Sequence, residues 1–416
     1  MNIKILTIVF AMVITQINAQ NNIVSIDSLI KTGRYKQALS ILDKSEETFK
    51  SNSKIAIIYE AIDNHKKASE FYKKALTFKD DYRTKIKLGK SLIKQQKIKE
   101  AITLFEEVSV QDENNLFVKY MLGKLYLQRK KAKKAKIIFN ELIKKDLRNA
   151  NYHYQLGLAN MLLGEKNKRI DNFLAAYDSD KTHFKAIEKL ARVYTKLRDK
   201  DSARLFTEKG LYLNPNHINL NRLKINALYL EKKYKQSILL LNRIDSLAPK
   251  EHYTNKMLAK CYYQLKDYEK AAKYFSIATK LDYEDFKSHR YLGDIYYEQD
   301  KTQKAMYSYF LSTYVGKKTR DKGYMGLAKV YSRMKLPKRV IEQYKLAIKE
   351  NRKNHLALYE LARISENFYK DKKIAYNLFT KYIAQFEGKD KDIDAFVKNR
   401  LNAIKKEYFL KGEPLK

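Results

Sequence analysis

A leucine followed by a small residue recurs along this chain at an almost constant interval, and this repeat limits the possible folds more than any other feature. The small residue of each pair stands at Gly89, Gly123, Gly157, Ala191, Ala259, Gly293, Ala328 and Ala362. Neighbours in this series are 34 residues apart or twice that distance, except for one step of 35 residues before Ala328. A period of this length predicts tandem structural repeats rather than a set of unrelated domains.

Each repeat also carries a second set of apolar positions. Ala101, Phe105 and Val108 follow Gly89 at offsets of 12, 16 and 19 residues, and most other repeats have small or apolar residues at these places. Spacings of three, four and seven residues place side chains on one face of a helix, so each repeat should contain two amphipathic helices that form a hairpin. We expect the small residue of the first helix to let the second helix approach closely. The aromatic residue of the second helix should fill the space between neighbouring hairpins.

Glycine and proline are scarce, with 12 and 4 residues in a chain of 416. All-β folds need many turns of the kind that these residues form, so the predicted fold class is all-α. Pro215 and Pro249 stand where the second helix of a repeat has to end.

The pattern resembles the tetratricopeptide repeat, a 34-residue unit with Leu-Gly, Tyr, Ala, an aromatic residue, Ala and Pro at fixed places. The repeat that begins at Tyr253 matches through Leu258, Ala259, Tyr262, Ala271, Phe275 and Ala278. The chain departs from the family pattern because it contains no tryptophan, because Arg169 occupies a small position and because Ile225 replaces a glycine or alanine. The resemblance covers roughly residues 49–388, and it implies a right-handed superhelical solenoid of helix-turn-helix repeats.

The start of the chain is typical of a secretory signal peptide. Lys4 precedes an apolar run from Ile5 to Thr15, and residues 17–19 offer a cleavage site before Gln20. We find no second apolar segment that is long enough to span a bilayer. We therefore expect an exported protein, periplasmic or secreted and at most peripheral to the envelope, with no membrane span in the mature chain.

The sequence predicts four segments along the chain. Residues 1–19 form the signal peptide, 20–48 a degenerate N-terminal capping hairpin, 49–388 an array of about ten repeats, and 389–416 a C-terminal capping helix and tail. Arrays need such caps because the terminal hairpins otherwise expose an apolar face. In the last segment, the residues expected to cover the final hairpin are Ala395, Phe396, Ile404, Tyr408 and Phe409.

The resemblance implies that the first helices line a concave groove that binds peptides or partner proteins. The residues assigned to this groove by their places in the repeats are Phe117, Tyr120, Lys124, Tyr154, Arg192, Arg222, Asn226, Tyr229, Tyr253, Lys256, Lys260, Tyr263, Arg290 and Tyr297. Phe117, Tyr120 and Tyr154 form either a binding face or a packing contact with a neighbouring helix. Arg222 and Asn226 resemble half of the carboxylate clamp of some family members, but Lys260 stands where that pattern has asparagine.

The groove residues are basic and rich in tyrosine, in a chain with 85 Lys+Arg, 47 Asp+Glu and a formal net charge of +38. Lys256 and Lys260 are one helical turn apart, and they repel each other unless an anion lies between them. The favoured partner is therefore an acidic peptide or protein. An anionic glycan or a peptidoglycan surface is the alternative, and a purely solubilising role for the charge also stays open. Export argues against a nucleic-acid partner.

The sequence offers no pattern typical of catalysis, of a cofactor site or of a metal site. His183 and His217 occupy the same place in successive repeats. Neighbouring helices pack about 8–10 Å apart, which is too far for one ion with bonds of ~2 Å. Cys261 is the only cysteine, and its register place holds Val193 in another repeat, so we expect a small core residue. The prediction is a non-enzymatic interaction scaffold of the cell envelope.

Overall fold

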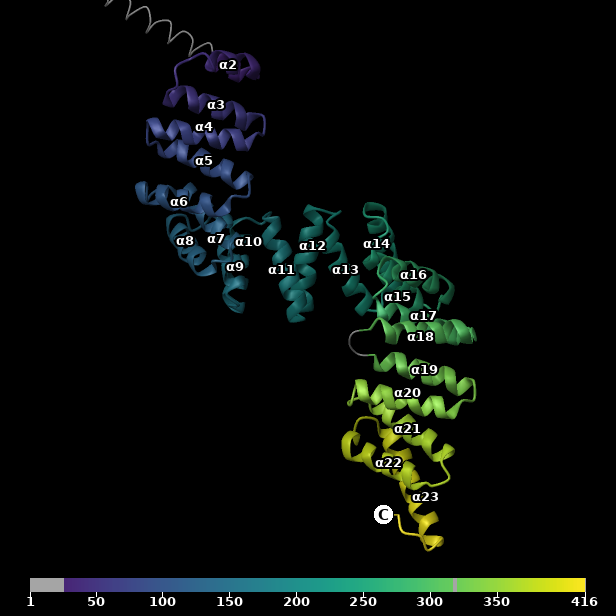
Figure 1. Cartoon of the computed structure of the whole chain (residues 1–416). Coiled ribbons are helices and arrows are strands. Elements are labelled where there is room, and N and C mark those ends of the chain that lie inside the picture. Colours follow the sequence, from purple (N-terminus) through teal and green to yellow (C-terminus); the bar gives the residue numbers. More distant parts are fainter. Residues whose placement is uncertain (1–25, 317–319, 416) are drawn as a thin grey trace, which may run out of the picture. The chain divides into compact units, whose positions relative to one another are not determined.

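Helices form nearly all of the regular structure in this computed structural model, which describes residues 26–316 and 320–415 (Figure 1). No residue of these ranges lies in a strand, so the predicted all-α fold of tandem helical hairpins is confirmed. The chain divides into two compact units, residues 1–213 and 214–416, and each is described by itself. The predicted signal peptide, residues 1–19, lies outside the described residues.

The first unit begins with helical residues 26–31 and α2 (Tyr35–Leu42). Ile26, Ala38 and Leu42 form one buried cluster with Ile55 and Ile58, which attaches this region to the first full hairpin. The hairpins of this unit are α3 (Phe49–Ala61) with α4 (His65–Phe78), α5 (Tyr82–Lys94) with α6 (Ile98–Gln111), α7 (Leu116–Gln128) with α8 (Ala132–Lys145), α9 (Ala150–Leu162) with α10 (Lys166–Ser179), and α11 (Phe184–Leu197) with α12 (Lys200–Leu213).

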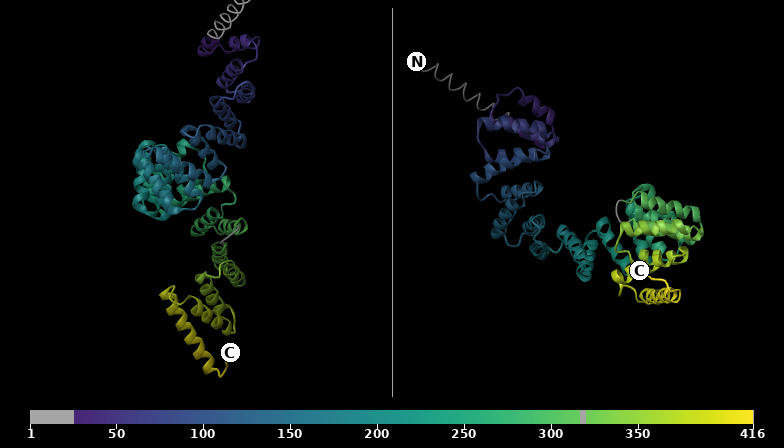
Figure 2. Two further views of the ribbon diagram at one scale, coloured as in Figure 1. Left: turned by 90° about the vertical axis from the view of Figure 1, so that its left-hand side faces the viewer. Right: turned by 60° about the horizontal axis from the view of Figure 1, so that its bottom comes forward.

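The second unit contains five further hairpins and a longer terminal helix, which is drawn in yellow (Figure 2). The hairpins are α13 (Ile218–Leu230) with α14 (Tyr234–Leu247), α15 (His252–Gln264) with α16 (Tyr268–Leu281), α17 (Phe286–Glu298) with α18 (Thr302–Tyr314), α19 (Asp321–Arg333) with α20 (Pro337–Glu350), and α21 (His355–Phe368) with α22 (Lys373–Phe386). The terminal helix is α23 (Lys391–Leu410).

Nearly every hairpin turns through a residue in the left-handed backbone conformation, with φ between 56° and 76°. These residues are Asp63, Gln96, Lys130, Gly164, Arg198, Lys232, Lys266, Asp300 and Lys335. They repeat with the same period as the helices, and a left-handed residue is a common way to end an α-helix. All except Gly164 have side chains, so the scarcity of glycine in the sequence does not prevent these turns.

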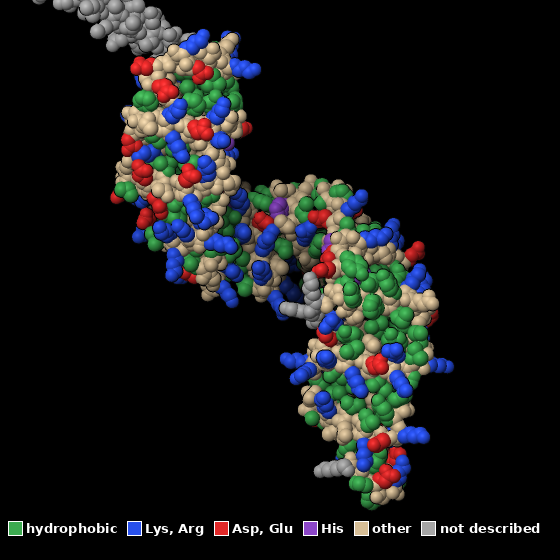
Figure 3. All heavy atoms as spheres, viewed as in Figure 1, with side chains coloured by type: hydrophobic (Ala, Val, Ile, Leu, Met, Phe, Trp, Pro, Cys, Tyr) green, Lys and Arg blue, Asp and Glu red, His purple; other side chains and the backbone are tan. Residues whose placement is uncertain are grey.

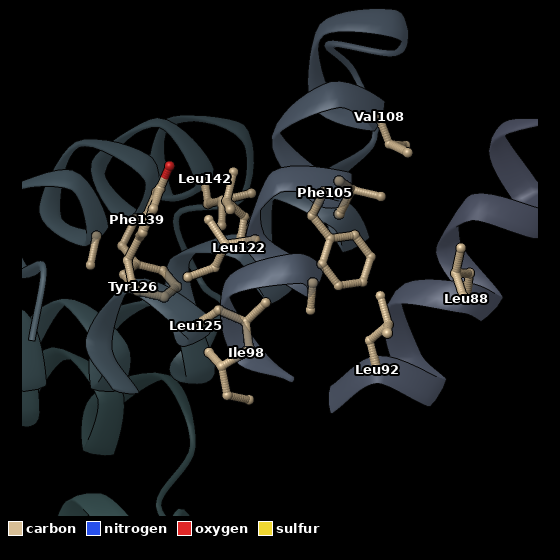
Figure 4. Close-up of a cluster of buried hydrophobic side chains, with 14 of the residues drawn as sticks. Leu88, Leu92, Ile98, Phe105, Val108, Leu122, Leu125, Tyr126, Phe139 and Leu142 are labelled. Atoms are coloured by element: carbon tan, nitrogen blue, oxygen red, sulfur yellow. The ribbon is translucent and has the colours of Figure 1, made fainter. Parts of the chain in front are cut away.

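The small residues of the first helices contact the aromatic rings of the second helices directly. A Cβ atom added to Gly89 would lie 2.7 Å from Cζ of Phe105, and one added to Gly123 would lie 2.6 Å from Cζ of Phe139. Phe105 and Phe139 are fully buried among leucines of neighbouring helices (Figure 4). Each ring therefore packs against the glycine of its own hairpin, a contact that was not predicted from the sequence.

Tyr309 of α18 contacts glycines of two consecutive hairpins. A Cβ atom would lie 2.5 Å from Cδ1 of this ring at Gly293 of α17, and 2.3 Å from the same atom at Gly326 of α19. Here the aromatic residue does pack between hairpins, as the sequence predicted, and both glycines are needed for the close approach.

The terminal helix α23 covers the last hairpin as predicted, with a face that includes the predicted Ile404 and Tyr408 but not Ala395 or Phe409. Val397, Ile404 and Tyr408 are buried against α21 and α22, whereas Ala395 is exposed and Phe409 is 84% exposed. The period of the repeats ends before this helix, so the repeat register gives no information about its orientation. Phe396, which was also expected to cover the hairpin, is partly exposed and has its ring edge-on to Tyr359 at 5.7 Å.

Candidate functional site

Three consecutive first helices of the second unit bring nine of the predicted groove residues together. We call this set the first-helix row; it consists of Arg222, Asn226 and Tyr229 of α13, Tyr253, Lys256, Lys260 and Tyr263 of α15, and Arg290 and Tyr297 of α17. The members on α13 and α15 contact one another across the two helices. The Tyr253 hydroxyl donates to Oδ1 of Asn226 at 3.1 Å, and Nζ of Lys260 lies 4.4 Å from the centroid of the Tyr229 ring.

The row continues from α15 to α17 through stacked and edge-on rings. The Tyr263 ring lies 5.0 Å from the Tyr291 ring, which in turn stacks on Phe275 at 4.9 Å. At the far end of the row, the guanidinium of Arg333 from α19 lies 3.7 Å from the centroid of the Tyr297 ring. The first-helix row therefore combines aromatic rings and cations on three neighbouring first helices, and Tyr291 provides the aromatic link between α15 and α17.

Most cations of the row already have an acidic partner within the chain. Arg222 forms an ion pair with Glu251, Lys256 with Asp285 at 2.8 Å, and Arg290 with Asp294 at 2.7 Å. Arg222 pairs with Glu251, and Asn226 accepts a hydrogen bond from Tyr253. Both side chains therefore have partners within the chain, unlike the free side chains of a carboxylate clamp.

Asp285 is the most buried of these acidic partners and joins two hairpins. Its carboxylate accepts hydrogen bonds from Lys256, from the Ser288 hydroxyl and from Nε2 of His252 at 2.9 Å. Burial by itself would raise the pKa of the Asp285 carboxyl, but the hydrogen bonds from Lys256 and Ser288 outweigh it and hold this pKa below its ordinary value. The anion that the spacing of Lys256 and Lys260 calls for is thus supplied, in part, by the protein itself.

Lys260 differs from the other cations of the row because it forms no ion pair within the described ranges. Its side chain is partly buried over the Tyr229 ring. Burial and the positive charges of Lys256 and Lys287 lower the pKa of the Lys260 ammonium. A partly buried cation without an anion is the position on this surface where a carboxylate from outside would gain most.

Three tyrosines of the row, Tyr229, Tyr253 and Tyr263, keep their hydroxyl protons at neutral pH. Burial raises the pKa of Tyr229, Tyr253 and Tyr263 to about 12 in each case. Their phenol groups therefore serve as neutral hydrogen-bond donors and as flat apolar surfaces, which suits the recognition of a peptide.

The remaining predicted groove residues lie in the first unit, where the structure separates exposed residues from buried ones. Phe117 is 44% exposed and has Nζ of Lys90 4.7 Å from its ring centroid. Tyr120 is partly buried, with Nζ of Lys124 5.4 Å from its ring centroid.

Tyr154 and Arg192 complete the predicted set in the first unit. Tyr154 is buried, and its ring lies 5.8 Å from Phe173 and 5.2 Å from the imidazole of His183. Of the two interpretations of the aromatic cluster, packing therefore applies to Tyr154. Arg192 is exposed and pairs with Glu188 of its own helix at 2.7 Å.

The acidic partners Glu251 and Asp285 were not recognised in the sequence. Each stands 29 residues after its cation, at the N-cap of the following first helix. This recurring offset is the signal that would have found them, because it places a residue of one repeat beside the start of the next.

The histidines and the cysteine have structural positions. His183 caps α11 by accepting the amide of Ala186 at Nδ1 at 3.1 Å, and His217 caps α13 in the same way. Cys261 is fully buried, which confirms the prediction of a core residue, and burial raises the pKa of its thiol to about 11. Within residues 26–316 and 320–415 no group of three or more His, Cys, Asp or Glu side chains has the geometry of a metal site.

Comparisons with known proteins agree on one family. Three family models, each described as tetratricopeptide repeat, match residues 92–158, residues 256–319, and residues 49–82 together with 184–217. No curated protein matches the sequence. None of the helices in the described ranges is both long and apolar enough to cross a membrane.

Several solved structures are similar to this chain at low sequence identity. Yeast Tom70 is 14% identical, with 94% of this chain and 97% of that chain covered and a TM-score of 0.43. MamA from Desulfovibrio magneticus RS-1 is 21% identical, with 41% and 96% covered and a TM-score of 0.39. PilF of Pseudomonas aeruginosa is 17% identical, with 51% and 96% covered and a TM-score of 0.44.

Proposed function

Because this chain belongs to the tetratricopeptide repeat family, whose repeats generally serve as protein-interaction modules, we propose that it is a non-enzymatic scaffold of the cell envelope. In this proposal the protein binds an acidic peptide or protein partner along its first-helix row, without a cofactor and without a chemical step.

The observation that carries the proposal is the state of Lys260. Lys256 and Arg222 are satisfied by Asp285 and Glu251, so they hold the shape of the surface rather than attract a ligand. Lys260 lies over the Tyr229 ring, and no acidic residue of the described part of the chain pairs with it. A partner carboxylate that reaches Lys260 would stabilise the ammonium and would accept hydrogen bonds from the neighbouring phenol groups.

The rings that surround Lys260 support a peptide as the ligand. Tyr229 and Tyr263 are partly buried, and each leaves part of its ring uncovered on the same surface. Aromatic rings with polar hydroxyls provide large contact areas at a low cost in conformational entropy. A chain of acidic and apolar residues would match both features.

The cellular location is proposed from the first residues of the chain. Lys4, the apolar run after it and the small residue Ala19 support export and cleavage before Gln20. N-terminal sequencing of the protein from a cell fraction tests this directly. A start at Gln20 in the envelope or periplasmic fraction is expected, and a start at Met1 in the cytoplasm would contradict it.

Affinity capture from an envelope extract tests the binding proposal. The bait is the chain beginning at Gln20, compared with a variant that carries Lys124→Glu and Lys260→Glu. The matched control carries Lys133→Glu and Lys235→Glu. These two lysines are exposed and lie on second helices, one in each unit, as Lys124 and Lys260 lie one in each unit. The control therefore changes the net charge by the same amount as the Lys124/Lys260 variant. Arg192 and Lys256 are left unchanged because they hold Glu188 and Asp285.

The expected result is a protein that the wild-type bait and the control retain and the Lys124/Lys260 variant loses. The captured protein is then purified and titrated against the three baits. If all baits bind the same material and binding falls steeply with salt, the charge acts generally and the glycan alternative gains support. If none of the baits retains a protein, the proposed scaffold function of this surface fails.

A further inference from the structure

The outward face of α18 carries an aromatic stripe. We use this name for Tyr307, Phe310 and Tyr314, which are 60%, 51% and 73% exposed. Their spacing of three and four residues places them in line along about 10 Å of one helix. The Phe310 and Tyr314 rings stack at 5.9 Å, and no charged side chain of α18 interrupts the line. Figure 3 shows hydrophobic side chains gathered over this part of the second unit.

The stripe is an exception among the repeats. One repeat earlier, the equivalent places on α16 hold Lys273, Ser276 and Lys280. One repeat later, the equivalent places on α20 hold Glu342, Lys345 and Lys349. Both neighbours show that the fold accepts polar residues there, so the three rings of α18 are not required by the hairpin itself.

A hollow lies beside the stripe and gives it a specific shape. Its lining comes from three helices: Thr279 of α16, His289, Leu292 and Tyr296 of α17, and Gln303, Lys304, Tyr307, Ser308 and Leu311 of α18. Leu292 and Leu311 are buried at its base, and Tyr307 stands at its edge. An apolar side chain that enters this hollow would contact leucine and tyrosine carbons on several sides.

The charges around the stripe decide which occupant fits. Lys273 and Lys280 on α16, Lys304 on α18, and Lys345 and Lys349 on α20 form no ion pair within the described chain, and Glu342 is the one acid at the equivalent places. A second copy of this chain would bring its own lysines against them, and like charges facing each other weaken association. An acidic surface would instead be attracted to this rim.

We propose that the aromatic stripe and its hollow bind an amphipathic helical segment of another protein, with apolar side chains on the stripe and glutamates or aspartates facing the surrounding lysines. A helix with apolar residues at intervals of three and four matches the spacing of Tyr307, Phe310 and Tyr314. The stripe lies on a second helix, and none of the residues of the stripe or of the hollow belongs to the first-helix row.

A fluorescently labelled synthetic peptide tests the proposal. The peptide forms an amphipathic helix with leucine and phenylalanine on one face and glutamate on the other; a second peptide replaces the glutamates with lysines. Binding to the chain beginning at Gln20 is measured by fluorescence anisotropy. The key variant, Tyr307→Lys with Phe310→Ser and Tyr314→Lys, gives α18 the residues that α16 carries, and circular dichroism checks its helix content.

Two further variants serve as controls. Leu239→Lys introduces a lysine at the place on α14 that corresponds to Tyr307, on a side chain that is 71% exposed. Lys260→Glu disrupts the first-helix row and leaves α18 unchanged, so failure of the stripe and failure of the proposed function are distinguishable.

The acidic peptide is expected to bind the wild type and both controls, and to bind the stripe variant about 30-fold more weakly, the loss typical of removing aromatic anchors. The proposal is overturned if the stripe variant binds the acidic peptide as tightly as the wild type, if the wild type does not bind it, or if the lysine peptide binds equally well. Sedimentation of the wild type as a dimer that the stripe variant abolishes would assign the surface to a second copy instead.

Discussion

The contact between Gly123 and Phe139 shows how a single residue sets the distance between two helices. Cζ of the Phe139 ring occupies a position only 2.6 Å from where a Cβ of residue 123 would be. A methyl group there has to push a fully buried ring out of place. The same contact recurs at Gly157, where the added Cβ would lie 2.5 Å from Cε1 of Phe173.

We therefore predict that Gly123→Ala lowers the free energy of unfolding by about 1–3 kcal/mol, the range for overpacking a filled core. Urea unfolding measures this change. Adding Phe139→Leu to the Gly123→Ala variant should recover part of the lost free energy of unfolding, because the smaller leucine side chain leaves room for the methyl group of Ala. A double variant whose loss equals the sum of the two single losses would show that the two side chains do not compete for this space.

The left-handed turn residues allow a second prediction at this scale. Lys130 has a φ of 57°, and replacing it with glycine removes the steric penalty of a Cβ in this conformation. Part of the gain is lost to the greater freedom of glycine in the unfolded chain, so Lys130→Gly should raise the free energy of unfolding by about 0.5–1 kcal/mol.

Gly164 provides the reciprocal test. It stands at the same place one repeat later with a φ of 76°, and a Cβ added there meets nothing within 4 Å. Gly164→Ala should therefore destabilise through the backbone alone, by about 1 kcal/mol. Thermal unfolding compares the stability of both variants with that of the wild type. Lys130→Gly should be more stable and Gly164→Ala less stable, and a change in the same direction for both would contradict the explanation.

At the scale of helices, Asp285 couples the hairpin of α15 to the start of α17. Its carboxylate is the N-cap of α17 and holds Lys256 and His252 of α15. Its lowered pKa means that the ionised form stabilises the fold above the ordinary carboxyl pKa, and that this stabilisation is lost as the pH falls through the folded-state pKa.

Asp285→Asn should lower the free energy of unfolding at pH 7 by about 3 kcal/mol, because Lys256 then loses its buried partner. The variant should also lose less stability than the wild type when the pH is taken from about 5 to below the ordinary carboxyl value of about 4. Urea unfolding across this range measures both effects. Parallel curves for the two proteins would mean that Asp285 is not the group responsible.

Some elements were predictable from the sequence and others were not. The period of 34 residues located the helical hairpins, and the offsets of 12, 16 and 19 from Gly89 identified Ala101, Phe105 and Val108, which are fully buried. The buried face of α23 was predicted only in part, and the ion pair between Lys256 and Asp285 was not predicted. Periodicity defines a helix face only where repeats are present, and it does not show which polar residues of successive repeats are close in space.

The candidate site was predictable to a similar extent. The register placed Tyr253 and Lys256 on one helix face. Contacts between α13 and α15 join the predicted positions, and the Tyr263 ring meets α17 through Tyr291. It did not separate Lys256, which has a partner, from Lys260, which has none within the described residues. That distinction depends on the position of Asp285, and it changes which cation is proposed to bind the partner.

At the scale of the whole chain, the repeats are expected to unfold by region. Each repeat in such an array contacts mainly its neighbours, so stability is distributed along the chain rather than shared by a single core. Gly123→Ala should accelerate hydrogen exchange in helices of the first unit, and Asp285→Asn should do so in the second. Hydrogen exchange followed by mass spectrometry resolves these regions. Equal acceleration everywhere by either variant would indicate one cooperative unit.

The most direct test of the proposed scaffold function is site-specific photo-crosslinking in living cells. The crosslinking residue is placed at Phe117 or at Tyr263, on the first helices, and for comparison at Tyr212 or at Leu239, on second helices, where the side chains are 87% and 71% exposed. If the partner binds along the first helices, a defined protein adduct is expected from Phe117 and Tyr263 and none of the same mass from Tyr212 and Leu239. The same adduct from all four positions, or adducts from the second helices alone, would contradict binding along the first helices.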